Sequence, residues 1–125
     1  MSYTENMGCI TVEASADLSA SQYEFVDVNA DGQLAVVSVK GAKAIGVLQD
    51  KPSAKGRPGS VAVRNVCKVA AGAAVDAGDE VIADATGRAI AKDAADQFVM
   101  GTAMQSAGAA GVIIPILINK YQASA

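Results

Sequence analysis

A chain of 125 residues is long enough for one domain with a single hydrophobic core. Its 15 valines and 8 isoleucines far outnumber its 4 leucines, and side chains that branch at Cβ favour β-strands. The net charge of −3 is small, and the absence of histidine excludes the Ser/His/Asp and Cys/His catalytic sets together with the commonest transition-metal ligand. We therefore expect an all-β protein that is not an enzyme.

The first eight residues, MSYTENMG, are polar and without periodicity, and we expect residues 1–8 to form a flexible N-terminal arm. A single β domain is expected over residues 9–120, with a C-terminal tail over 121–125. The arm does not resemble a secretory signal, and no apolar run approaches the roughly 18 residues of a membrane span. In a cytosolic chain Cys9 and Cys67 would stay reduced, and Cys67 is expected to be a small core residue.

The segment DVNADGQLAVVS begins with the spacing of an EF-hand calcium loop. Asp27, Asn29, Asp31 and Gly32 fall where such a loop has its first three ligands and its turn glycine. The twelfth position is Ser38, however, and not a carboxylate, and the flanking runs YEFVDV and QLAVVSV show no helical periodicity. We therefore predict a β-hairpin at this point and no metal ion or cofactor.

Further strands are expected at CITVEA before this hairpin and at KAIGVLQ after it. The loop DKPSAKGRPG follows, whose prolines and glycines exclude regular structure. The next run, SVAVRNVCKV, alternates as a half-buried strand does, and its interruption at Asn65 indicates a bulge or a buried hydrogen bond. EVIA and RAIA are predicted to pair across the turn DATG.

Basic residues are concentrated in one part of the chain. Between Lys40 and Lys68 the sequence holds seven basic residues and one acid. Such segregation could orient the protein on a partner or between copies of itself, and an ordinary solvated face is the alternative. The segment contains no Phe, Tyr or Trp to stack on bases, so nucleic acid is not expected as a partner.

Two segments about 55 residues apart share a plan. AIGVLQDKPSAKGRPGSVAV and VMGTAMQSAGAAGVIIPI both run from an apolar residue and a glycine through a short strand and a loop to a β-branched strand. Gly46 thereby matches Gly101, and each glycine is expected at a bulge or sharp bend. The echo is consistent with a pseudo-symmetric small barrel or sandwich.

The last strand, VIIPILI, is apolar at every position. It contains Pro115, which cannot donate to a central hydrogen-bond ladder and predicts an edge strand or a bulge. An apolar edge strand needs a cover, because its unpaired backbone groups otherwise promote aggregation. Either the chain's own loops or another subunit could supply that cover.

The order and spacing of the turns in GSVAVRNVCKVAAGAAVDAGDEVIADATGRAI and VMGTAMQSAGAAGVIIPILI resemble those of bacteriophage capsid cement or head-decoration proteins. The resemblance covers roughly residues 44–118. It implies a small antiparallel β-barrel or sandwich, tulip-like or jelly-roll-like, that forms a homodimer or homotrimer and has no catalytic residues. It also implies a structural virion protein, assembled in the host cytoplasm, that binds the outer surface of the capsid and cements neighbouring major capsid protein subunits.

Three regions are predicted to contact the partner: the arm, the basic loop and the last strand. The residues are Ser2, Tyr3, Thr4, Glu5, Asn6, Lys51, Lys55, Arg57, Ile114, Pro115 and Ile116. The alternative function is a non-catalytic β-barrel accessory or ligand-binding module of a larger complex. No cofactor, nucleic acid or membrane is expected in either case.

Overall fold

The computed structural model describes residues 7–122, which form nine β-strands and contain no helix that could cross a membrane. The strands are β1 (Met7–Glu13), β2 (Phe25–Val28), β3 (Leu34–Val36), β4 (Gly46–Leu48), β5 (Pro58–Ala70), β6 (Glu80–Ala83), β7 (Ala89–Ala91), β8 (Phe98–Ala103) and β9 (Ile113–Gln122). They pair in the order β3-β2-β4-β5-β9-β8-β6-β7, with β1 added beside β5, and every strand pair is antiparallel. The predicted all-β class is confirmed.

The strand order contains an internal repeat. The pairs β2·β3, β2·β4 and β4·β5 recur as β6·β7, β6·β8 and β8·β9, and the register recurs 55 residues later, so that Val26↔Gly46 corresponds to Val81↔Gly101. The pair β1·β5 likewise recurs as β5·β9. We call residues 7–64 repeat 1 and residues 66–122 repeat 2. The predicted echo is therefore confirmed and extends over the whole fold.

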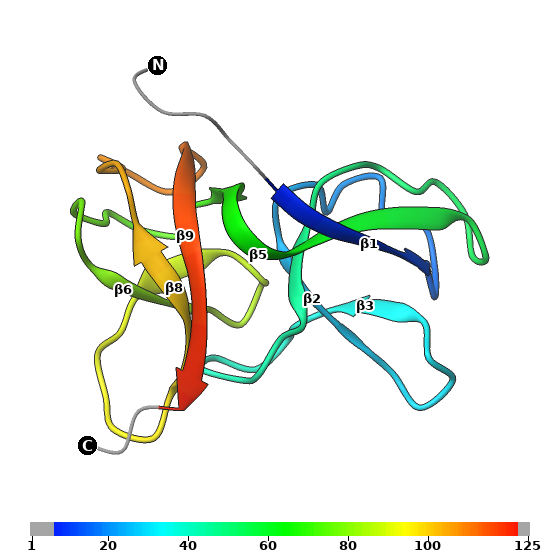
Figure 1. Ribbon diagram of the computed structural model, residues 1–125, viewed down its shortest axis with the longest axis horizontal. Coiled ribbons are helices and arrows are strands. Elements are labelled where there is room, and N and C mark those ends of the chain that lie inside the picture. Colours follow the sequence, from blue (N-terminus) through cyan, green and yellow to red (C-terminus); the bar gives the residue numbers. More distant parts are fainter. Residues whose placement is uncertain (1–6, 123–125) are drawn as a thin grey trace.

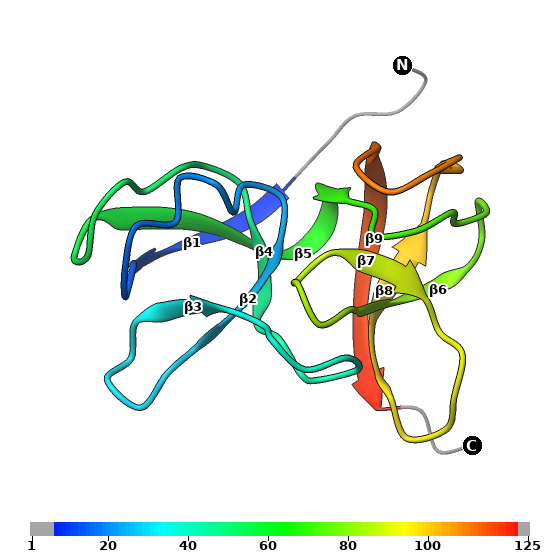
Figure 2. The same ribbon diagram turned by 180° about the vertical axis from the view of Figure 1, so that it is seen from behind.

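The long strand β5 belongs to both repeats (Figures 1 and 2). Its first half pairs with β1 and β4, and its second half pairs with β9. Between the halves lies Asn65, whose φ of 65° is in the left-handed region that asparagine tolerates. The side chain of Asn65 is exposed, so of the two predicted alternatives the buried hydrogen bond is wrong, whereas the pairing with β1 has a register shift directly before Asn65, between Ala62 and Arg64. The interruption lies where the strand passes from one repeat to the next.

Each repeat curls into a small barrel. A parallel bridge from Ala14 to Leu34 joins the end of β1 to β3, and the bridge from Ala71 to Ala89 joins the end of β5 to β7 in the same way. These bridges connect the first strand of each repeat to its third and so close the ring. The two barrels lie side by side and share β5 (Figure 2).

The segment with EF-hand-like spacing is the β2–β3 hairpin, as predicted. The side-chain oxygen of Asn29 accepts hydrogen bonds from the backbone N–H groups of Asp31 and Gln33, both at 3.0 Å. Gly32 closes the turn with a φ of 75°. Repeat 2 has the same turn, where Asp84 accepts from two backbone N–H groups. The polar side chains at these positions form turns.

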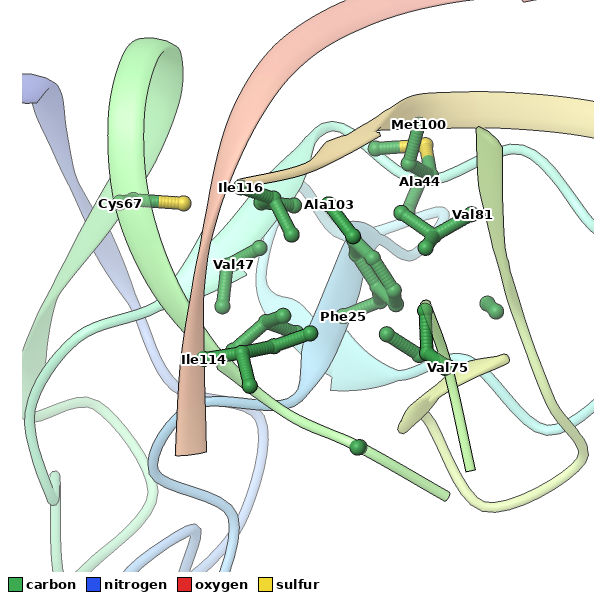
Figure 3. Packing of buried hydrophobic residues seen from close by; sticks show 14 of the residues in the cluster. Phe25, Ala44, Val47, Cys67, Val75, Val81, Met100, Ala103, Ile114 and Ile116 are labelled. Atoms are coloured by element: carbon green, nitrogen blue, oxygen red, sulfur yellow. The ribbon is translucent and has the colours of Figure 1, made fainter. Parts of the chain in front are cut away.

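The two barrels fill their interiors differently. Repeat 1 places Leu34 and Leu48 in its core, whereas the matching positions of repeat 2 are Ala89 and Ala103. The space left by the smaller residues is filled by Phe25, which comes from repeat 1 and lies fully buried in the core of repeat 2 (Figure 3). Its neighbours in Figure 3 include Val75, Val81, Met100 and Ile114. Among the described residues no polar or charged side chain is buried, so the core is held by apolar packing alone.

Polar contacts also join the repeats. The backbone N–H of Ala70 donates to the carbonyl oxygen of Tyr23 at 2.8 Å. Lys40 of repeat 1 and Asp93 of repeat 2 form an ion pair at 2.7 Å. The hydrogen bond from Lys40, with a second one from Gln97, holds the pKa of Asp93 below its usual value. This ion pair lies at the surface and contributes little, whereas the packing around Phe25 buries apolar surface between the repeats.

Strand β9 lies between β5 and β8, so the prediction of an edge strand around Pro115 is wrong. The carbonyl oxygen of Pro115 accepts from the N–H of Met104, which follows the last residue of β8. In an antiparallel strand the N–H and C=O groups of one residue point toward the same neighbouring strand, so an N–H at position 115 would also point toward β8. The ladder with β8 has already ended at this position, and the N–H that proline lacks is therefore not needed there. Repeat 1 has Ser60 here, and its N–H donates to the side chain of Asp50 at 3.0 Å.

Candidate partner-binding surfaces

Large hydrophobic side chains gather along one side of repeat 2. Eight such side chains are exposed among the described residues, and five of them lie on β9 or directly beside its first half. We call these five residues the β9 face: Met104, Val112, Ile113, Leu117 and Tyr121. An exposed apolar cluster of this kind is typical of an interaction surface.

The β9 face follows from the alternation along the strand. Ile113 and Leu117 are each 42% exposed, whereas Ile114 and Ile116 point into the core and are 1% and 0% exposed. Pro115 is buried as well. The three residues predicted here as partner contacts are therefore covered by the chain itself, and Ile113 and Leu117 on either side of them are exposed.

A second surface is the basic loop, which we define as residues 51–57. The N–H of Leu18 donates to the carbonyl oxygen of Pro52 and that of Gly56 donates to Ala14, both at 2.8 Å. The buried ring of Pro52 also anchors the loop. The three basic side chains predicted as contacts are exposed and form no ion pair among the described residues: Lys51, Lys55 and Arg57.

The matching loop of repeat 2, residues 106–112, has the same backbone hydrogen bonds. Val75 donates to Ala107 at 3.0 Å and Gly111 donates to Ala71 at 2.8 Å. Its sequence, SAGAAGV, contains no charged residue. The loop conformation therefore does not require the three basic side chains of the basic loop, which leaves them available for a partner.

The predicted contact regions do not form one site. The basic loop, between β4 and β5, and the β9 face lie toward opposite ends of the molecule in Figure 1. The predicted arm contacts Ser2, Tyr3, Thr4, Glu5 and Asn6 lie outside the described residues. Strand β1 begins at Met7, within the range predicted as an arm, and β9 ends at Gln122, within the predicted tail.

The side chains of the described residues form no group of three or more His, Cys, Asp or Glu that could hold a metal ion. Cys67 is buried in the core of repeat 2, as predicted, and Cys9 is exposed on β1. The candidate contact surfaces among the described residues are therefore the apolar β9 face and the basic loop.

Comparison with known proteins gives matches to a protein family and to solved structures. A family model described as phage cement protein matches residues 5–118. The solved structure of the N base of the head fiber gp8.5 in bacteriophage phi29 is 18% identical, with a TM-score of 0.71 over 96% of this chain and 100% of that chain. A search of curated proteins finds no match. At this identity the likeness to the head fiber base shows a shared fold.

Proposed function

The chain belongs to the phage cement protein family, and on this basis we propose that it binds the outer surface of an assembled phage capsid and cements neighbouring major capsid protein subunits. Its role in the phage capsid is structural. The proposal includes no catalytic step, cofactor or nucleic acid. The observation that supports it most directly is that one chain exposes two separate surfaces of different character, the apolar β9 face and the basic loop.

Cementing requires two contact surfaces that lie apart on the protein. A protein that only decorates the capsid needs one contact, whereas a protein that cements must hold two subunits at once. The basic loop and the β9 face lie on different repeats, and the shared strand β5 fixes the repeats relative to each other. Two modest contacts made by one rigid body give strong attachment, because the second contact forms within the complex.

The two surfaces would recognise different chemistry. The β9 face offers exposed side chains of Ile113, Leu117 and Tyr121 to an apolar patch on one capsid subunit. The basic loop offers three cations to an acidic patch on the neighbouring subunit, and its hydrogen bonds to residues 14–18 keep it ordered before binding. The buried residues Ile114 and Ile116 support the β9 face from within.

Charge reversal of the basic loop tests this proposal. The triple variant Lys51→Glu, Lys55→Glu, Arg57→Glu should bind heads that lack the protein with an affinity about tenfold lower, because three charge contacts become repulsive. The difference should shrink as the salt concentration rises. Co-sedimentation of the purified chain with empty heads measures the affinity. Lys43→Glu, exposed in the loop before β4, is the matched control and should bind normally.

An unchanged affinity of the triple variant at low salt would remove the basic loop from the proposal. The fold of the variant can be checked separately by its unfolding midpoint. That midpoint should stay near the wild-type value, since the three side chains are exposed and form no ion pair among the described residues.

A further inference from the structure

The loop between β3 and β4, residues 37–45, reaches from repeat 1 into the sheet of repeat 2 (Figure 2). Strands β6 and β8 pair through Glu80 and Val81 only. Beyond these pairs, the N–H of Gly41 donates to the carbonyl oxygen of Ala83 at 2.8 Å, and its carbonyl oxygen accepts from the N–H of Phe98 at 3.0 Å. One residue of repeat 1 therefore supplies backbone pairing that β6 and β8 do not give each other.

Side chains beside Gly41 complete this contact. Lys40 forms its ion pair with Asp93 at 2.7 Å. A Cβ on Gly41 would lie 3.0 Å from the Cγ of Gln97, and the φ of Gly41 is 76°, a conformation that residues with a side chain rarely adopt. We call the place that Gly41 occupies the filled slot, and it is formed by Ala83, Asp93, Gln97 and Phe98.

Repeat 1 has the same slot without an occupant from residues 7–122. The counterparts of the four residues, 55 positions earlier, are Val28, Ser38, Ala42 and Lys43. All four line a single hollow of about 200 Å³ at the surface of repeat 1. Val28 is 43% exposed, whereas its counterpart Ala83 is 0% exposed. We call this hollow the open slot.

The backbone groups of the open slot are also free to pair. In β2 the carbonyl oxygen of Val26 accepts from the N–H of Ile45 at 3.0 Å, and that of Val28, two residues on, points to the same side. The N–H of Lys43 corresponds to that of Phe98 in the filled slot. Neither the carbonyl of Val28 nor the N–H of Lys43 has a hydrogen-bond partner within residues 7–122. The open slot thus offers one acceptor and one donor, as the filled slot does.

We propose that the open slot binds an extended loop of another protein, with a glycine at the position that Gly41 takes in the filled slot. That glycine would donate its N–H to Val28 and accept from the N–H of Lys43. The sheet of repeat 1 would then gain the backbone pairing that repeat 2 already has. The inserted residue is a glycine because the backbone there needs a positive φ.

The side chains around the open slot define what precedes and flanks this glycine. Ser38 stands where Asp93 pairs with Lys40, so the open slot does not select a cation before the glycine. Val28 and Val39 both line the hollow, and Val39 is 65% exposed. Apolar residues of the bound loop would cover these two valines, as is usual where exposed apolar side chains surround a binding site.

A second copy of the chain is not the expected occupant. Its matching loop is residues 92–97, between β7 and β8. To enter the open slot as the β3–β4 loop enters the filled one, the copy would bring Glu80 to the place of Phe25 and bury an unpaired carboxylate. The open slot shares no residue with the basic loop or the β9 face, so the inference goes beyond the proposed function.

A peptide copied from the β3–β4 loop tests the open slot. The isotope-labelled full chain is titrated with the peptide VSVKGAKA, residues 37–44, and followed by NMR. The amide of Lys43 should shift saturably at millimolar peptide, whereas the amide of Phe98 should not, because the filled slot is already occupied. The control peptide VSVKAAKA should bind about tenfold more weakly, since alanine resists a positive φ. An unmoved Lys43 amide, or equal affinity for the two peptides, would overturn the proposal.

Ser38→Asp gives the open slot the carboxylate that Asp93 supplies in the filled slot. This exposed substitution should tighten binding of VSVKGAKA about threefold, and the gain should vanish with VSVAGAKA, which lacks the lysine. A variant without this gain would contradict the placement of the peptide.

The Lys43 amide in the absence of peptide distinguishes the other occupants. A shift of this amide with protein concentration would make a second copy the occupant, and a shift on deletion of residues 1–6 would make the arm the occupant. Either result contradicts the proposal. Head binding plays no part in these measurements, so its loss would contradict the proposed function alone.

Discussion

Phe25→Ala should lower the free energy of unfolding by about 3–5 kcal/mol, out of the roughly 5–15 kcal/mol that a domain usually has. Phe25 is fully buried, and its ring fills the part of the repeat 2 core that Ala89 and Ala103 leave open. Removal of the ring opens a cavity between the repeats that the surrounding β-strands cannot close. The backbone N–H of Phe25 also donates to Gly87 at 2.6 Å, which fixes the strand beside that cavity.

Urea unfolding followed by circular dichroism at one fixed protein concentration measures the loss. Val39→Ala is the control, because Val39 is 65% exposed and its truncation should change the free energy of unfolding by less than about 0.5 kcal/mol. A loss below about 1 kcal/mol for Phe25→Ala would contradict the view that this residue joins the two repeats.

Gly101→Ala should also destabilise the protein, by about 1–3 kcal/mol. A Cβ on Gly101 would overlap the carbonyl oxygen of Leu117 in β9, and a Cβ on Gly46 would overlap that of Ala62 in β5. These oxygens belong to the backbone of a neighbouring strand, so relief requires the strands to separate. The same close approach occurs in both repeats, and Gly46→Ala should therefore have a similar effect.

Gly108→Ala is the matched control for both substitutions, since a Cβ there meets no atom within 4 Å. It should leave the protein as stable as the wild type or more stable by about 0.4–1 kcal/mol, because alanine restricts the unfolded chain. The unfolding midpoints of Gly101→Ala, Gly46→Ala and Gly108→Ala measure these differences in stability. Equal midpoints for Gly101→Ala and Gly108→Ala would show that the strand contact at Gly101 tolerates a side chain.

The two repeats differ at the position of Phe25. The counterpart of Phe25 in repeat 2 is Glu80, which is exposed on β6. The interior of repeat 1 is filled instead by its own Leu34 and Leu48. We therefore expect that the contact joining repeat 1 to repeat 2 is not repeated between chains.

The strands and the echo around Gly46 and Gly101 could be predicted from the sequence, because β-branched runs and glycines recur at a fixed spacing. Each glycine was expected at a bulge or sharp bend, and the structure shows a close backbone approach at both and a register shift beside Gly101. The difference between the interiors of the two repeats could not be predicted. Leu34 and Ala89 occupy the same place with different volumes, and only the packed structure shows that Phe25 compensates for the smaller residue. Alternation along β2 assigns Phe25 to one side of a strand without indicating that this side packs against the other barrel.

The candidate partner contacts, too, could be predicted from the sequence only in part. Charge and proline content predicted the exposed basic loop, because no core can hold three unpaired cations. The last strand is apolar throughout, so its pattern did not indicate which residues face outward, and Pro115 wrongly indicated an edge. The exposed positions Ile113 and Leu117 were missed for this reason. That Pro115 lies beyond the end of β8 follows from the pairing of β9 with its two neighbouring strands, β5 and β8, which only the structure shows.

The central claim, that the chain cements a phage capsid, is tested most directly on DNA-filled heads that lack it. Purified protein is added, its occupancy is measured, and the heads are heated until they release their DNA. The account predicts saturable binding and a higher release temperature for the wild type, with a smaller gain for Leu117→Asp, which disrupts the β9 face. Heads that bind no protein, or that release DNA at the same temperature with the protein bound, would contradict it.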